Sequence, residues 1–275
     1  VVPGSEAASY PFWSPDSRSL AFFNTRQLLR VEVGEGAPQP LTAVGDARGG
    51  SWGANGIIVY APSYDSALFQ IPASGGQPAP SSVLDATRSE GTHRFPSFLP
   101  DGRHFLFETR NYSAWLGNTG EGVFVGSIAD PAERVQLLAD ASNAIYAAGH
   151  LLFVRNGTLW AQRFDPERLA LSGAVAGLVQ DVRFDRRFSL GVFSAAADVL
   201  VLQHGAGQDE SELVWLDRTG RRLERFGGPA IRDGVDLSPD GTKAAVSVTD
   251  PVTARAHLEI VDLAEERSTR LTLDE

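Results

Sequence analysis

The feature that most constrains the fold is a Pro-Asp turn between two short apolar segments, which occurs three times. The copies are WSPDSRSLAFF (13–23), FLPDGRHFLFE (98–108) and LSPDGTKAAVS (237–247). Proline presets the backbone angle that the second turn position needs, and Asp followed by Gly or Ser suits the reversal after it. The apolar residues after each turn are typical of a strand. Each copy therefore predicts a β-hairpin.

The spacing of these hairpins indicates a repeat. Pro15 and Pro100 are 85 residues apart, and Pro100 and Pro239 are 139 apart, which corresponds to two and three steps. Repeats of roughly 40 to 50 residues made of short strands indicate propeller blades. Weaker copies fill the gaps at SWGANGIIVYA (51–61), IYAAGHLLFVR (145–155) and FSAAADVLVLQ (193–203), so the turns fall near positions 16, 55, 101, 148, 198 and 240.

A second strand–turn–strand segment follows each hairpin, as in LLFVRNGTLWAQRF, where Asn156-Gly157 is a strong turn signal. A lone four-stranded sheet cannot bury both faces, whereas blades around an axis cover one another. We predict an all-β fold, a six-bladed β-propeller of four-stranded antiparallel blades. It forms one domain over 1–275, with repeats at approximately 5–46, 47–90, 91–141, 142–186, 187–230 and 231–275. Regular spacing disfavours the alternative of two stacked β-sandwiches.

Composition and charge exclude several kinds of partner. The net charge is −10 without long single-sign blocks, so phosphate backbones would repel the chain and we predict no nucleic-acid binding. No apolar run approaches the about 18 residues of a membrane helix, so we expect no membrane contact by this segment. Cysteine is absent, which excludes disulfides and thiolate chemistry. The chain begins Val-Val-Pro without Met, so we expect a processed protein or a piece of a longer one.

Several segments together resemble one family: YPFWSPDSRSLAFF, GGSWGANGIIVYAP, GTHRFPSFLPDGRHFLFET, LLFVRNGTLWAQRFD, and ELVWLDRTGRRL followed by LSPDGTKAAVS. Over essentially the whole chain they resemble the WD40-like, TolB-type β-propeller regions of bacterial receptor-like serine/threonine protein kinases. The resemblance implies an extracytoplasmic sensor domain, on the periplasmic or extracellular side of a bacterial membrane protein. It implies no kinase chemistry for this chain, because the His-Arg-Asp and Asp-Phe-Gly motifs of kinases are absent.

Motifs that could carry chemistry have structural interpretations. GGSWG (49–53) matches the nucleophile elbow G-x-S-x-G, with Ser51 as nucleophile, but no helix is predicted after it. The five histidines form no metal-binding pattern. Asp16, Asp101 and Asp240 recur at the turn positions, which predicts turn capping instead of calcium binding. We therefore predict no catalytic residue, no metal, no cofactor and no enzyme activity for this chain.

The mouth of the central channel is the predicted ligand site, because loops on one face of a rigid scaffold commonly carry function. It is formed by residues before the inner strands and by loops between second and third strands. Several arginines facing one funnel predict a small anionic ligand, or a protein or peptide with acidic residues, as the partner. The candidate binding residues are Tyr10, Arg48, His93, Arg94, Arg110, Asn111, Trp115, Arg155, His204, Arg232 and Asp233, with Phe188 at the same level.

The sequence thus favours a non-catalytic ligand- or protein-binding sensor module, the extracytoplasmic propeller of a bacterial serine/threonine kinase. Two alternatives stay open. One is a TolB-like periplasmic scaffold that holds protein partners. The other is a metal-dependent propeller hydrolase or lactonase, which would need carboxylates and Asn converging on one cation in the channel.

Overall fold

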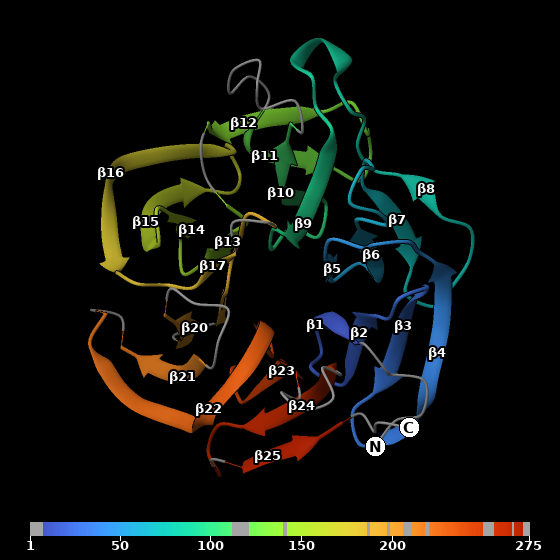
Figure 1. The fold of residues 1–275 in the computed structure, drawn as a ribbon. Helices are drawn as coiled ribbons and strands as arrows, with labels where there is room; N and C mark the ends of the chain where they lie inside the picture. Colours follow the sequence, from blue (N-terminus) through green and yellow to red (C-terminus); the bar gives the residue numbers. More distant parts are fainter. Residues whose placement is uncertain are drawn as a thin grey trace.

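The computed structural model describes residues 8–111, 121–139, 142–185, 188–196, 199–205, 211–217, 220–249, 256–265 and 267–271. Regular structure in these residues is β-strand except for one short 3₁₀ turn, η1 (Ala86–Arg88). Six four-stranded antiparallel blades succeed one another around a central axis, as Figure 1 shows. The predicted fold class is therefore confirmed. None of the described residues belongs to a helix long and apolar enough to cross a membrane.

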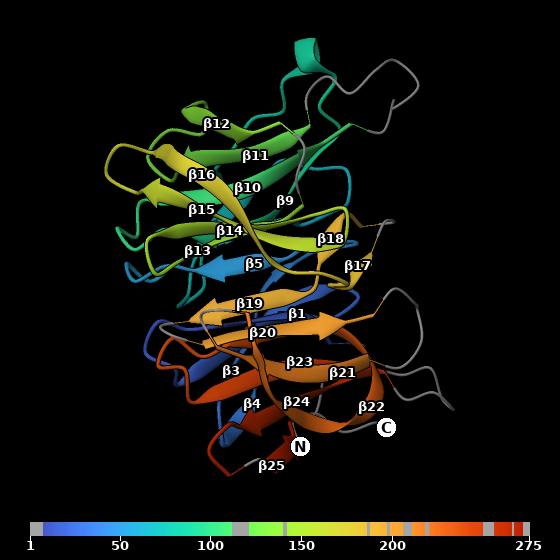
Figure 2. The ribbon, with the colours of Figure 1, turned by 90° about the vertical axis from the view of Figure 1, so that its left-hand side faces the viewer.

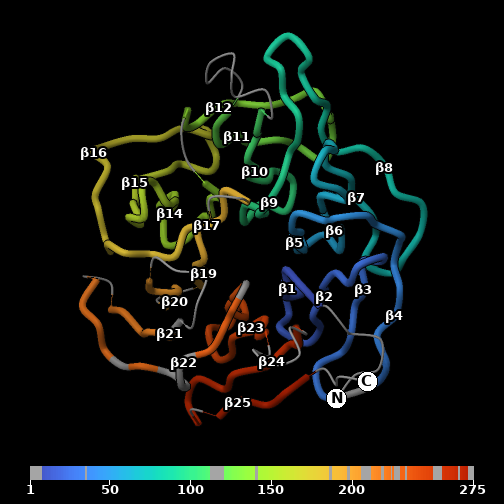
Figure 3. The backbone as a smooth tube through the Cα atoms, viewed as in Figure 1, coloured from blue at the N-terminus to red at the C-terminus, as the bar shows by residue number. Residues whose placement is uncertain are grey.

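Each blade takes its strands in chain order from the axis outward, and Figure 3 follows the chain round the ring. Blades 1 to 3 consist of β1 (Ser9–Trp13), β2 (Ser19–Phe23), β3 (Gln27–Glu32), β4 (Glu35–Ala43); β5 (Gly50–Trp52), β6 (Ile57–Tyr60), β7 (Phe69–Pro72), β8 (Ala79–Pro80); and β9 (Thr92–Phe98), β10 (His104–Arg110), β11 (Gly122–Ser127), β12 (Arg134–Leu138). Blade 4 and most of blades 5 and 6 consist of β13 (Ala144–Ala147), β14 (His150–Arg155), β15 (Thr158–Asp165), β16 (Ala170–Val179); β19 (Phe193–Ala196), β20 (Val199–His204), β21 (Ser211–Leu216); and β23 (Lys243–Thr249), β24 (Ala256–Asp262), β25 (Arg267–Arg270).

Blades 5 and 6 share one long strand, β22 (Arg222–Leu237). Its first half pairs with β21 as the outer strand of blade 5, and its second half pairs with β23 as the inner strand of blade 6. Between blades 4 and 5 the chain forms a separate hairpin from β17 (Phe184–Asp185) and β18 (Leu190–Gly191). The edge view in Figure 2 places this hairpin at one face of the ring, which we call the mouth face.

The Pro-Asp turns close through the aspartate side chains. Asp16 Oδ1 accepts from the Arg18 backbone N–H at 3.1 Å. Asp240 Oδ1 likewise accepts from the Thr242 N–H at 2.9 Å. Asp101 Oδ1 accepts from two successive backbone N–H groups at 2.9 Å each. The predicted turn-capping role of these aspartates is confirmed, and it explains why the phrase recurs where a second strand begins.

The core lies between blades, and its composition changes around the ring. Phe12, Phe23 and Tyr60 pack between blades 1 and 2. Phe105 and Phe124 belong to the cluster between blades 2 and 3. The cluster between blades 4 and 5 is mainly aliphatic, with Leu152, Val154, Leu159, Ala161, Val182, Leu202, Val214 and Leu216 beside Phe193. Each blade therefore buries its faces only because its neighbours cover them.

The ring closes by packing of blade 6 against blade 1, with the half-buried carboxylate of Asp236 at the junction. The Trp13 backbone N–H donates to Asp236 Oδ2 at 3.2 Å, and the Trp13 indole N–H donates to the Asp236 carbonyl at 3.3 Å. Ser194 Oγ in blade 5 donates to Asp236 Oδ1 at 2.9 Å. Side chains of three successive blades thus meet at Asp236.

We expect Asp236→Ala to lower the free energy of unfolding by about 1–3 kcal/mol, because the Trp13 N–H and the Ser194 hydroxyl lose their acceptor. Urea denaturation measures the change, with Asp65→Ala as an exposed control that should differ little from the parent. Equal stability of the Asp236 variant and the parent would show that the junction does not depend on this carboxylate.

Candidate functional site

The inner strands leave only a narrow channel along the axis. Five blades present Pro11, Gly50, Pro96, Ala144 or Gly234 to it, and its volume is about 120 Å³. A Cβ atom on Gly50 would lie 2.6 Å from the Phe12 ring, so the close approach requires glycine. The described residues that line the channel include no carboxylate and no histidine. The polar side chains among them are Tyr10, Ser97 and Asn143.

Arginines stand at the rim of this channel, immediately before the channel-lining residues. Arg48 precedes Gly49, which has a φ of 85°. Arg94 precedes Phe95, which has a φ of 50°. These left-handed residues interrupt the strand geometry between the rim and the channel. Arg232 occupies the corresponding position in blade 6, where the pairing of β22 with β23 is irregular.

The β17–β18 hairpin lies over the rim and is held by arginines from blades 2 and 3. The Arg48 guanidinium lies 4.7 Å from the centroid of the Phe188 ring. Arg94 Nη1 donates to the Phe188 carbonyl at 3.0 Å, and Arg110 Nη1 donates to Ser189 Oγ at 2.9 Å. These contacts span the mouth, because the hairpin comes from between blades 4 and 5. Four residues of the predicted set thus meet here: Arg48, Arg94, Arg110 and Phe188.

A buried glutamate lies beneath these arginines. The Glu108 side chain is fully buried, and Arg110 Nη1 lies 3.8 Å from Glu108 Oε1. Neither carboxylate oxygen accepts a hydrogen bond of good geometry. Burial raises the pKa of Glu108 to about 8, although Arg110, Arg94 and the nearby Ser189 hydroxyl oppose the shift. Glu108 is therefore mainly protonated at neutral pH and does not cancel the charge of the arginines.

A recess of about 430 Å³ opens beside the hairpin, between blades 1 and 2. It is lined by Tyr10, Arg48 and Phe188, together with Asn24 in the turn between β2 and β3. Burial raises the pKa of Tyr10 to about 12, so its hydroxyl stays neutral. Arg48 Nη2 donates to the exposed Asp46 carboxylate at 2.7 Å. Asp46 also lines the recess, which therefore contains two aromatic rings, a hydroxyl and a guanidinium paired with a carboxylate.

Other residues of the predicted set lie elsewhere on the mouth face. Asn111 follows Arg110 and is buried. Arg155 and His204 end the second strands of blades 4 and 5, and the Arg155 guanidinium lies 5.3 Å from the centroid of the Phe153 ring. Trp115 lies outside the described residues, and so does the side chain of Asp233.

Arg232 is buried in blade 6 and lies near Glu259 of the same blade. Burial lowers the pKa of the Arg232 guanidinium, and the Glu259 charge opposes this shift. The Arg232 carbonyl accepts from Gln203 Nε2 at 2.7 Å, which links blades 5 and 6. The predicted binding role of the whole set stays a prediction.

His93 does not line the recess but takes part in a buried relay that the sequence patterns did not reveal. Ser82 Oγ lies 2.7 Å from His93 Nδ1, and Glu90 Oε2 lies 3.1 Å from His93 Nε2. Glu90 also accepts from Arg134 Nη1 at 2.7 Å. Ser82 and Glu90 belong to the long connection between β8 and β9 and match no motif. No sequence signal could therefore have paired them with His93.

The hydrogen-bonded arrangement of Ser82, His93 and Glu90 resembles that of a catalytic triad, but its environment indicates a structural role. All three residues are buried, and Ser82 Oγ accepts from the Leu68 backbone N–H at 2.8 Å. Burial lowers the pKa of His93, and Glu90 opposes that shift, so the ring is neutral at pH 7. The cavities at the mouth and in the channel do not reach Ser82. The relay fastens the β8–β9 connection to blade 3.

The donor set for a metal-dependent lactonase is not found in the part of the chain that the structure describes. No group of three or more His, Cys, Asp or Glu side chains there is placed to hold a metal ion. Asp236 and Asn143, two oxygen donors near the axis, are already bonded to neighbouring blades or to Gly191. The described residues therefore do not fit a metal centre in the channel.

Comparisons with known proteins support the fold. No family model and no curated protein matches the sequence. TolB from Acinetobacter baumannii has a TM-score of 0.66 and 16% identity, over 100% of this chain and 66% of that chain. A gluconolactonase from Xanthomonas campestris has a TM-score of 0.65 and 13% identity, over 93% of this chain and 86% of that chain. At such identities the likeness shows the β-propeller fold alone.

A puromycin-hydrolysing peptidase from Mycobacterium tuberculosis has a TM-score of 0.64 and 12% identity, over 98% of this chain and 53% of that chain. The chain thus spans about half the length of this peptidase and just under two thirds of TolB. The prediction that the chain is not an enzyme is wrong as an inference from this fold. It relied on missing sequence motifs, whereas the gluconolactonase, a hydrolase, has a propeller of similar extent.

The buried Glu108 predicts a loss of stability as the pH rises. Its folded pKa of about 8 exceeds its ordinary value of 4.5. Between these values the folded protein keeps a proton that the unfolded chain releases, so raising the pH from 5 to 9 should cost on the order of a few kcal/mol. Glu108→Gln should remove much of this pH dependence, whereas the exposed control Glu133→Gln should retain it. Urea denaturation at both pH values measures the effect, and parallel pH profiles for the parent and Glu108→Gln would contradict the assignment.

Proposed function

We propose that this propeller binds an acidic segment of a partner protein at the mouth face. The observation that carries the proposal is the recess beside the β17–β18 hairpin, where Tyr10, Phe188 and Arg48 line about 430 Å³. Tyrosine and arginine are among the residues most enriched at binding hot spots. The rings offer apolar contact area to side chains of the segment, and the guanidinium would exchange its Asp46 partner for charge-assisted hydrogen bonds to the carboxylates of the segment.

Electrostatics of the mouth support an acidic partner. Arg94 and Arg110 hold the hairpin next to the recess, and the protonated Glu108 beneath them adds no negative charge at neutral pH. The chain as a whole carries a net charge of −10. A cluster of arginines on an otherwise acidic surface steers a negatively charged segment to one place and disfavours its binding elsewhere.

We propose a TolB-like scaffold role for this propeller, in preference to a sensor role in a receptor kinase. TolB aligns over this whole chain, whereas the kinase association relies on the sequence resemblance alone. We accordingly propose a periplasmic location for the binding function. A kinase-linked sensor is the narrower form of the same proposal, and a kinase domain with a membrane helix encoded in the same gene would favour it.

Binding of a fluorescein-labelled hexaglutamate peptide, followed by fluorescence anisotropy, tests the proposal. We expect Arg48→Gln to weaken binding about tenfold, because the guanidinium in the recess wall is removed, and added salt to weaken it further. Arg267→Gln, an exposed change on blade 6, is the matched control and should bind like the parent. Hexalysine binding as tightly as hexaglutamate, or equal affinity of Arg48→Gln and the parent, would contradict the proposal.

A second candidate is hydrolysis of a lactone or ester at the same mouth without a metal ion. The observation that favours it is Glu108, a carboxylic acid whose pKa of about 8 suits proton transfer near neutral pH. Water would add to the carbonyl carbon, and Arg94 and Arg110 would stabilise the negative oxygen of the tetrahedral intermediate. As the bond from the carbonyl carbon to the leaving oxygen breaks, the Glu108 proton would pass to that oxygen, and the proton lost by the added water would return to the Glu108 carboxylate. The hairpin residues Phe188 and Ser189 would have to move away from Glu108 first.

Proton release from D-glucono-δ-lactone in the presence of a chelator tests this candidate. If the mouth is hydrolytic, Glu108→Gln should lower kcat at least tenfold while Glu133→Gln retains it, because only the former removes the proton donor. Hydrolysis by the parent at the rate of buffer alone, or an unchanged rate in Glu108→Gln, would exclude Glu108 as the proton donor.

A further inference from the structure

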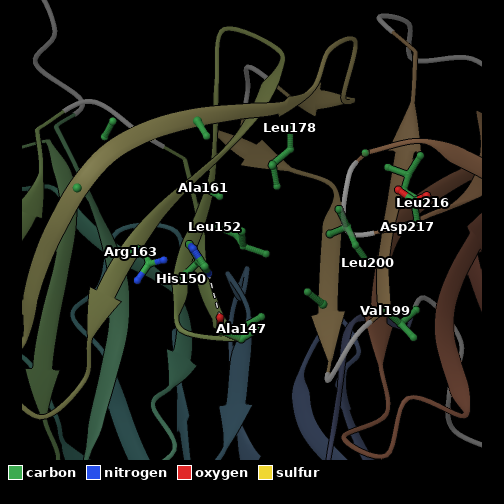
Figure 4. Close-up of a pocket in the computed structure, with 16 residues that line it drawn as sticks. Ala147, His150, Leu152, Ala161, Arg163, Leu178, Val199, Leu200, Leu216 and Asp217 are labelled. Carbon is green, nitrogen blue, oxygen red and sulfur yellow. Dashed lines mark hydrogen bonds between the residues drawn. The ribbon is translucent and has the colours of Figure 1, made fainter.

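A separate cavity of about 370 Å³ lies between blades 4 and 5, away from the mouth. It adjoins the turns that join β13 to β14 and β21 to β22, and these turns lie on the face opposite the mouth. Figure 4 shows the cavity beneath the curved β16, with Leu152 and Leu178 from blade 4 facing Leu200 and Leu216 from blade 5. Its walls are therefore mainly aliphatic.

The cavity exists partly because the outer strand of blade 4 bows away from its partner. Ala161 pairs with Ala176, whereas Arg163 pairs with Ser172. An advance of two residues along β15 therefore corresponds to four residues along β16, so β16 contains a bulge. Gly173 lies in the extra length and has a φ of 68°, in the left-handed region that favours glycine. The bulge carries β16 over the space between the blades.

The small side chains that line the cavity are a second reason why the space between blades 4 and 5 is not filled. Ala147, Ala161, Ala176 and Ala195 line the cavity from both blades. The interfaces between blades 1, 2 and 3 hold aromatic rings, whereas at this end the cluster between blades 4 and 5 consists of leucines and alanines that line the cavity. Protein interiors are normally close-packed, so an apolar space of this size is the kind that a small apolar group fills.

An arginine and a histidine stand at one end of the cavity. Arg163 and His150 are directly opposite each other on β15 and β14, and both line the cavity (Figure 4). Arg163 makes no ion pair with any other residue that the structure describes. His150 Nδ1 bonds the Ala148 carbonyl at 2.9 Å, so Nε2 is the ring nitrogen left for a ligand. On the other wall, Asp217 is already engaged by Arg221 at 3.3 Å.

We propose that this cavity binds a small molecule with an apolar tail and a carboxylate, such as a medium-chain fatty acid. The tail lies among the leucines and alanines between the two blades. The carboxylate accepts hydrogen bonds from the Arg163 guanidinium and, when Nε2 is protonated, from His150. The site is distinct from the recess on the mouth face, so its ligand is independent of the proposed partner protein.

Isothermal titration with octanoate, octanol and octyltrimethylammonium tests the proposal. We expect octanoate to bind at least tenfold more tightly than the other two compounds, which carry the same tail with a neutral or a positive head. Arg163→Gln should weaken octanoate binding at least tenfold by removing the charge. Ala161→Leu should weaken it similarly by filling the cavity, with thermal unfolding confirming that the variant is folded. Arg168→Gln, whose side chain is 84% exposed on the same blade, is the control and should bind like the parent.

Three results would contradict the proposal. Octanoate that fails to bind the parent up to millimolar concentration, or binds Arg163→Gln as tightly as the parent, would overturn it, and so would a folded Ala161→Leu with full affinity. Because Arg163→Gln changes only a side chain at the cavity edge, it tests the site even if the filled cavity prevents folding.

Discussion

The whole structure depends on the burial of each blade by its neighbours. A four-stranded sheet of this length has two apolar faces and only adjacent blades to cover them, so the ring must close for any blade to be stable. Closure draws six inner strands toward one axis, where Pro11, Gly50, Pro96, Ala144 and Gly234 allow the close approach. The resulting channel is narrow, and larger spaces lie at the rim and between blades 4 and 5.

At the rim, the burial of Glu108 and the charges of nearby arginines together determine the electrostatics of the mouth. Arg48, Arg94 and Arg110 hold the β17–β18 hairpin through a ring contact, a carbonyl and a hydroxyl, none of which neutralises them. The carboxyl group of Glu108, 3.8 Å from Arg110, is buried deeply enough to keep its proton near neutral pH, whereas the Glu121 carboxylate lies 3.6 Å from Arg110 Nε. Glu108 therefore adds no negative charge beside these arginines, because the energetic cost of burying its ionised carboxylate exceeds what the neighbouring arginines recover.

Blade interfaces of one fold are filled differently, and the differences create the second cavity. Aromatic rings such as Phe23 and Phe107 fill the early interfaces, while alanines and a bulged outer strand leave space between blades 4 and 5. The similarity to TolB and to a gluconolactonase concerns the shared backbone frame. Side chains at the rim and between blades differ from protein to protein on such a frame, so function follows from them.

Local sequence determined the blades. The Pro-Asp turns at Asp16, Asp101 and Asp240 need only residues two or three positions away, and their spacing sets the number of repeats. Arg48 and Arg94 could be placed at the rim for the same reason, since each precedes a predicted inner strand. Only the tertiary structure decided that Phe188 stacks on Arg48, that Glu108 is buried beneath Arg110, and that Ser82 and Glu90 flank His93. The contacts of Phe188 and of Ser82 join segments from different strands or connections, and the protonation of Glu108 depends on its burial, which no local pattern encodes.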